Sequence, residues 1–127
     1  MIDQLLINEI GDALATGVPG TFIGRMHTNA DVTLPAILLQ LEGESVVGSP
    51  LYRGTLQAMV VSAAADTTST EHGDLCAAVD EALRLMEVSV PPALSLYGIV
   101  PTTTAADTDG NQYRTTLSYT VGYGPTS

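Results

Sequence analysis

The sequence predicts a single α+β domain over residues 1–127, in the order α-β-β-α-β-β, with an antiparallel sheet and the helices packed on one face. Three observations indicate this class. Two segments repeat apolar residues at helical spacing, four others alternate apolar with polar residues, and polar or glycine-containing breaks separate them. A chain of 127 residues can also bury enough surface to fold without a disulfide or a metal.

The first helix is predicted over residues 2–15, because its apolar side chains share one face and its carboxylates lie away from that face. Gly17 is expected to cap its C-terminal end. The second helix is predicted over residues 71–86. A capping box formed by Thr68 and Glu71 is expected to begin it.

The strands are predicted over residues 36–42, 52–65, 94–100 and 112–122. The second of them would span roughly 40 Å, so one end is expected to project beyond the core. Asp109-Gly110 is a strong reversal signal and predicts a hairpin turn before the last strand.

The remaining stretches carry weaker signals. Residues 43–50 and 102–111 are expected to be loops, because they are rich in glycine and serine or in threonine and alanine. Residues 21–27 could form either a short strand or an extended arm, and residues 29–31 are typical of a turn.

Charge is the strongest compositional signal. Fourteen acidic residues face four arginines and no lysine, which gives a net charge of −10. Such a chain repels nucleic-acid phosphate and anionic membranes, and it lacks the basic patch that sequence-specific DNA binding needs. This balance could serve solubility alone, or it could keep a surface from adhering to DNA.

Other features of the sequence indicate in which cellular compartment the chain is expected. No apolar run reaches the roughly 18 residues of a membrane-spanning helix, and no secretory signal is expected from the first residues. The single cysteine, Cys76, excludes an internal disulfide framework and fits a reducing compartment.

No catalytic, cofactor or metal site is predicted. His72 and Cys76 lie one helical turn apart, but zinc needs three or four ligands, so a partly exposed histidine and a buried cysteine are expected instead. Glu42 and Glu44 share a strand face, where a solvated edge is favoured over an acid–base pair. Residues 107–111 favour a hairpin turn over a calcium loop.

Tyrosine and arginine are the residue types that protein interfaces favour. The arginines could also pair with acidic residues of a neighbouring copy. The interface candidates are therefore Arg53, Arg84, Arg114, Tyr52, Tyr113, Glu42 and Glu44, together with the two expected loops.

Five features extend over nearly the whole chain: a short N-terminal helix, the segment Pro35–Leu41, the strand around Leu56–Val61, the helix Leu75–Met86 and the closing segment Tyr113–Val121. In the order of their elements and in their local residue types they resemble the small tail-terminator and tail-completion proteins of long-tailed bacteriophages, and the related neck proteins. The segment Thr21–Asp31 has no assigned counterpart in this resemblance.

The resemblance implies a structural virion protein with no catalytic residues and no cofactor. It implies a homo-oligomeric ring, a hexamer, that caps the tail tube, ends its polymerisation and docks to the head connector. The implied partners are other copies, the tail tube protein and a head-completion or connector protein. DNA would pass through without specific binding. The location would be the virion tail or neck, assembled in the bacterial host cytoplasm.

Two alternatives remain open. The first is a head–tail connector or stopper component. The second is a small acidic enzyme or ligand-binding module, which would need a deep pocket around a carboxylate such as Glu42 or Glu44.

Overall fold

The computed structural model describes residues 2–26, 32–46 and 48–125. Its elements, in chain order, are α1 (Ile2–Gly17), β1 (Phe22–Arg25), β2 (Ala36–Ser45), β3 (Tyr52–Ala63), α2 (Ser69–Arg84), β4 (Ser89–Val90), β5 (Leu94–Asp109) and β6 (Gln112–Gly124).

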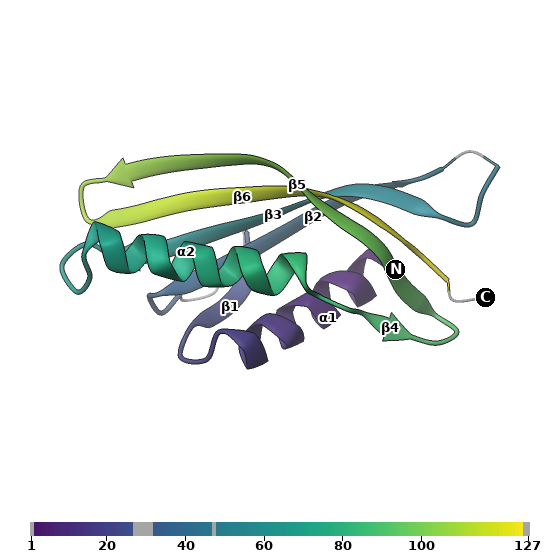
Figure 1. Cartoon of the computed structure of the whole chain (residues 1–127), viewed down its shortest axis with the longest axis horizontal. Coiled ribbons are helices and arrows are strands. Elements are labelled where there is room, and N and C mark those ends of the chain that lie inside the picture. Colours follow the sequence, from purple (N-terminus) through teal and green to yellow (C-terminus); the bar gives the residue numbers. More distant parts are fainter. Residues whose placement is uncertain (1, 27–31, 47, 126–127) are drawn as a thin grey trace.

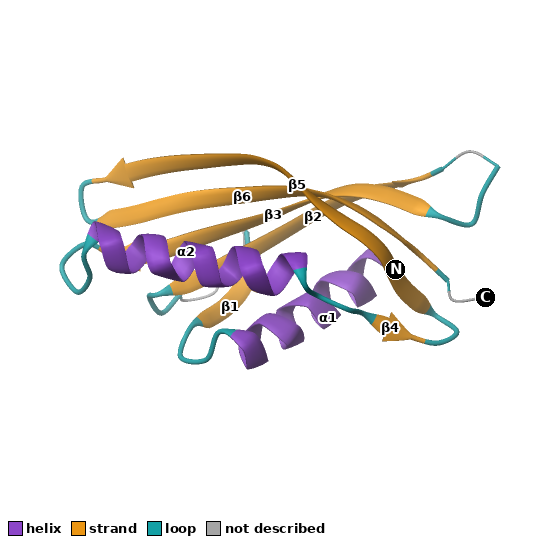
Figure 2. Ribbon diagram, viewed as in Figure 1, coloured by secondary structure: helices purple, strands orange, loops and turns teal. Residues whose placement is uncertain are grey.

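The strands form one six-stranded sheet in the spatial order β1-β2-β3-β6-β5-β4. β1 runs parallel to β2, and every other neighbouring pair is antiparallel. The sheet curls into a half-barrel, and both helices lie along the same side of it (Figures 1 and 2). α1 contacts β1, β2 and β5, although two strands separate β2 from β5 in the sheet. α2 contacts β3, β5 and β6.

The predicted fold was therefore wrong in three respects. The element order is α-β-β-β-α-β-β-β rather than α-β-β-α-β-β, the sheet is mixed rather than antiparallel, and its six strands curl into a half-barrel instead of forming a four-stranded sheet with the helices packed on one face. The strands missing from the prediction are short: β1 has four residues and β4 has two. Segments of that length are too brief for alternation to be recognised.

The correction that affects the most residues concerns β5. The prediction ended this strand at Val100 and assigned residues 102–111 to a loop. The strand instead continues through Pro101 to Asp109, with register shifts against β6 between Leu96 and Gly98 and between Pro101 and Thr103. A proline fits there because β5 is an edge strand at that point.

The boundaries of the other elements agree with the prediction in part. Thr68 accepts a hydrogen bond from the Glu71 amide at 3.1 Å and donates its own amide to the Glu71 carboxylate at 3.2 Å, so the capping box is confirmed. The hairpin turn is confirmed at Gly110, between β5 and β6. Gly17 is the last residue of α1, and the left-handed conformation (φ 82°) occurs at Gly20.

Two expected segments have a different outcome. Residues 21–27 contain a strand, β1, which was one of the two expected possibilities. The expected turn at residues 29–31 lies outside the described residues. The expected loop at residues 43–50 is shorter than predicted, because β2 continues to Ser45.

The hydrophobic core lies between the helices and the sheet. Its fully buried large side chains are Leu6, Ile10 and Leu14 of α1, Val79 and Leu83 of α2, Ile37 and Leu39 of β2, Leu56 and Val60 of β3, Leu94 of β5, and Tyr119 and Tyr123 of β6. The apolar face predicted for the first helix is confirmed, because Leu6, Ile10 and Leu14 are fully buried. β2 and β3 continue past the helices as a twisted arm that ends in their hairpin loop (Figure 1).

Candidate functional site

The predicted interface residues do not gather at one place. Four of them lie on the arm formed by β2 and β3. Arg53 is directly opposite Glu44 in the ladder, and both side chains are exposed. Glu42 lies on the same face, and these residues line a shallow hollow of about 400 Å³ with Thr55 and Thr120.

Tyr52 is the fourth residue of this group, and it points to the other face of the arm. Its ring stacks on Tyr123 of β6, with 5.6 Å between centroids and 13° between ring planes. Tyr52 is half-buried and packs against the core. In this chain it therefore joins the arm to β6.

Arg84 and Arg114 each have a partner within the chain. Arg84 on α2 pairs with Asp80 at 2.7 Å, and Arg114 on β6 pairs with Asp107 of β5 at 3.0 Å. Partly exposed ion pairs of this kind contribute up to about 1 kcal/mol each. Both arginines keep substantial exposure, so they remain able to contact a partner molecule.

The last candidate, Tyr113, belongs to a buried polar network that the prediction missed. The His72 ring lies between Ser62 of β3, 2.8 Å from its Nδ1, and Thr115 of β6, 2.9 Å from its Nε2. Cys76 Sγ lies 3.5 Å from the same Nε2, and the Tyr113 ring lies 5.6 Å from the imidazole. This network connects α2 to two strands of the sheet.

The expected burial of this pair was reversed. His72 is the buried residue, with 7% of its surface exposed, and Cys76 is only partly buried. Burial lowers the pKa of His72 and raises the pKa of the Cys76 thiol. A neutral histidine beside a neutral thiol is the reverse of an activated nucleophile pair. The network therefore serves packing rather than chemistry.

Two buried tyrosines of β6 tie the helices to the sheet. The Tyr119 hydroxyl donates to Asp80 of α2 at 2.5 Å, and the Tyr123 hydroxyl donates to Asp3 of α1 at 2.6 Å. Burial and the neighbouring carboxylate raise the pKa of both phenols. The sequence held a signal for this pairing, because the two tyrosines lie four residues apart on one strand face and each helix carries an aspartate.

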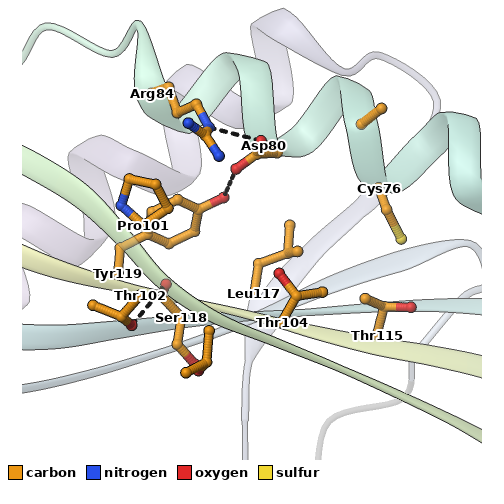
Figure 3. A pocket seen from close by; sticks show the side chains of 12 residues that line it. Cys76, Asp80, Arg84, Pro101, Thr102, Thr104, Thr115, Leu117, Ser118 and Tyr119 are labelled. Atoms are coloured by element: carbon orange, nitrogen blue, oxygen red, sulfur yellow. Dashed lines mark hydrogen bonds and ion pairs between the residues drawn. The ribbon is translucent and has the colours of Figure 1, made fainter.

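A groove of about 370 Å³ lies between α2 and the β5–β6 hairpin (Figure 3). Asp80 is held there by both Arg84 and Tyr119, so its carboxylate is already engaged. The opposite wall includes Thr104 of β5 and Thr102, whose hydroxyl donates to the Ser118 carbonyl at 3.1 Å. Such a lining can form hydrogen bonds but offers no poised acid or base.

Two further kinds of feature concern the described part of the chain, namely metal sites and membrane-spanning helices. No three His, Cys, Asp or Glu side chains gather there closely enough to hold a metal ion. No helix among the described residues has the length and apolar character needed to cross a bilayer.

The second half of β5 is an unusual surface. From Pro101 to Thr108 every residue is exposed, although the strand pairs with β6 on one side, with one register shift between Pro101 and Thr103. Its other side pairs with β4 only at Leu94 and Ser95. The Leu96 amide on this side donates to the Val88 carbonyl at 3.0 Å. From Tyr97 onward we refer to this side as the free edge of β5, because no other described strand pairs with it.

Comparisons with known proteins found similar structures but no similar sequences. No protein-family model matches the chain, and no curated protein matches its sequence. Among solved structures, it is similar to a chain from the "Virion of native gene transfer agent (GTA) particle", with a TM-score of 0.70 and 15% identity over 94% of each chain. A second solved protein, whose name describes no function, matches with a TM-score of 0.61 and 16% identity over 99% of this chain and 94% of the other.

Proposed function

We propose that this chain is a structural protein of a phage-like particle, and that it assembles as a ring on the end of the tail tube. The observation that carries this proposal is the shared fold with a chain of a gene transfer agent virion, which extends over 94% of both chains. A fold does not by itself specify a function, so the proposal also needs support from the surface.

The charge of the chain supports a role around DNA that does not involve binding it. The net charge is −10, and phosphate contacts need clustered cations. Three of the four arginines are engaged within the chain: Arg84 and Arg114 pair with aspartates, and Arg25 donates to Asn8. A ring of such subunits would present a channel through which DNA could slide.

The chemistry of the described residues favours a structural role over an enzymatic one. Glu42 and Glu44 lie in an open hollow rather than in a deep pocket. Asp80 is engaged by two partners, and burial keeps His72 and Cys76 neutral. The proposed partners are therefore macromolecular: other copies, the tail tube protein and a head-completion or connector protein.

The experiment that tests the proposal uses the purified chain and the tail tube protein encoded in the same genome. Under conditions in which the tube protein polymerises, adding this chain should yield shorter tubes, each with a ring on one end in negative-stain images. Tubes of unchanged length without rings would contradict the proposal. Binding to emptied heads but not to tubes would assign the chain to the connector or stopper instead.

A further inference from the structure

We propose that the free edge of β5 pairs with β1 of a second copy, so that the sheets of neighbouring subunits continue into one another. This inference rests on the ring proposed above and names the strands that join its subunits. β1 lies at one margin of the sheet, and the part of β5 beyond the two-residue strand β4 lies at the opposite margin (Figure 1). Joining one margin to the other is the heterologous contact that closes a ring.

The free edge is long and accessible. Val100 is 60% exposed and Tyr97 is 55% exposed, and all residues from Pro101 to Thr108 are exposed as well. In an edge strand of this kind, the backbone N–H and C=O groups that point away from the sheet lack a ladder partner. They can therefore accept a further strand by backbone hydrogen bonding.

The features of this edge that oppose strand addition lie in its first part, where Pro101 and the register shifts between Leu96 and Gly98 and between Pro101 and Thr103 occur. Edge strands are normally kept short or protected by lysine, proline or inward-pointing charge. Here Pro101 is the only proline of the strand, and the stretch Thr102–Ala106 contains only threonine and alanine. Threonine is a good strand former, so this stretch is suited to pairing.

The charge distribution indicates that the partner is a second copy. The net charge is −10, yet Leu96–Ala106 contains no charged residue. A cationic partner would be drawn to the acidic surfaces, whereas a neutral edge suits a partner that is equally acidic. β1 carries no acidic residue either, because its sequence is Phe-Ile-Gly-Arg. Pairing of these strands therefore brings no two carboxylates together.

The strand directions fit this pairing. β1 runs parallel to β2, and three antiparallel steps then lead from β2 through β3 and β6 to β5. β5 therefore runs opposite to β1, and a neighbour in the same orientation presents its β1 antiparallel to β5. In that neighbour β2 already lies between β1 and β3, so β1 is the strand at its margin to which β5 would be added.

The first test compares two threonine-to-lysine variants that lie on the same outer face of the sheet. Thr103→Lys places a charge on the free edge, whereas Thr120→Lys places it on β6, in the interior of the sheet. Both positions are exposed. Native mass spectrometry and sedimentation velocity should show that Thr103→Lys is monomeric at concentrations where the wild type and Thr120→Lys are assembled. Circular dichroism and the unfolding midpoint should be unchanged in both variants.

Two results would overturn the inference. If Thr103→Lys assembles like the wild type, the free edge is not the contact. If Thr120→Lys disrupts assembly as strongly as Thr103→Lys, the face of the sheet is the contact rather than its edge. Either result leaves the proposed function intact as long as the wild type still caps tubes. A wild type that caps tubes as a single subunit would contradict the inference and the ring together.

The second test identifies the strand on the other side of the contact. In a Cys76→Ala background, one preparation carries Thr103→Cys and another carries Thr21→Cys, directly before β1. A short bis-maleimide should give a covalent dimer in the mixture and in neither preparation alone. A dimer from Thr103→Cys alone would show that β5 pairs with β5, and no dimer in any sample would show that the two strands do not meet. Both outcomes reject the proposed pairing.

Discussion

β6 and the second half of β5 are partners in one hairpin, yet they have opposite relations to the core. β6 buries Leu117, Tyr119, Val121 and Tyr123 against the helices and the neighbouring strands. The second half of β5, from Pro101 to Thr108, buries none of its residues. The difference teaches that regular strand structure and a contribution to folding are separate properties. β6 holds the subunit together, while the second half of β5 is held in place by β6 and remains available to other molecules.

The largest expected effect comes from matched tyrosine truncations. Tyr119→Ala removes a fully buried ring and leaves Asp80 without its phenol partner, so it should cost about 3–5 kcal/mol of unfolding free energy. Tyr97→Ala on β5 removes a ring that is 55% exposed and one bond to the Pro125 carbonyl, and should cost less than about 1 kcal/mol. Urea denaturation measures both variants. Similar losses would show that β5 supports the core as much as β6 does.

Matched glycine substitutions should give the next largest difference. A Cβ on Gly43 of β2 would lie 1.8 Å from the hydroxyl of Tyr123, whose ring is fully buried. Gly43→Ala should therefore force the ring out of place and cost about 1–3 kcal/mol. Gly98→Ala on β5 meets nothing within 4 Å and serves as the control. The comparison fails if the midpoint of thermal unfolding falls equally in both proteins.

Threonine truncations probe the two strands with one chemical change. Thr115→Ala on β6 removes the 2.9 Å bond to His72 and leaves the buried imidazole nitrogen with only the Cys76 thiol, 3.5 Å away, so it should cost about 1–3 kcal/mol. Thr104→Ala on β5 alters an exposed side chain and should stay within about 0.5 kcal/mol of the wild type. Chemical denaturation separates the two, and a loss at Thr104 equal to that at Thr115 would contradict the account.

The smallest expected effect is a pH dependence that arises on the buried side of the sheet. Burial lowers the pKa of His72 below its usual value of 6.5, so the unfolded chain binds this proton more readily than the folded one. The contribution to stability is therefore complete above pH 6.5 and is lost progressively as the pH falls from 6.5 toward the folded pKa. His72→Gln removes the titration. Stability curves of the wild type and this variant should be parallel above pH 6.5 and converge below it, whereas parallel curves throughout would show that His72 does not contribute.

Much of the fold could be predicted where one face of an element is buried. The alternation in β3 and β6 and the helical spacing around Leu6 and Val79 record that burial directly in the sequence. The capping box at Thr68 could also be predicted, because both of its members lie within one turn of the chain.

There are also physical reasons why other parts of the fold could not be predicted from the sequence. The second half of β5 is exposed on both faces, so no apolar alternation marks it as a strand, and Pro101 argues against one. The His72 network joins residues 10 and 43 positions apart, and no local pattern reports such contacts. Of the candidate surface residues, Glu42, Glu44 and Arg53 are brought together by the β2–β3 register, while the remaining candidates lie elsewhere.

Hydrogen exchange tests the central claim most directly, namely that the free edge of β5 carries contact between copies rather than the fold. Amide exchange would be measured for the wild type across a dilution series from the assembled to the monomeric state. The account predicts that amides in Tyr97–Ala106 and in Phe22–Arg25 gain protection on assembly, while amides of β6 are protected at every concentration. If β5 exchanges at the same rate in both states while another surface becomes protected, the claim is contradicted.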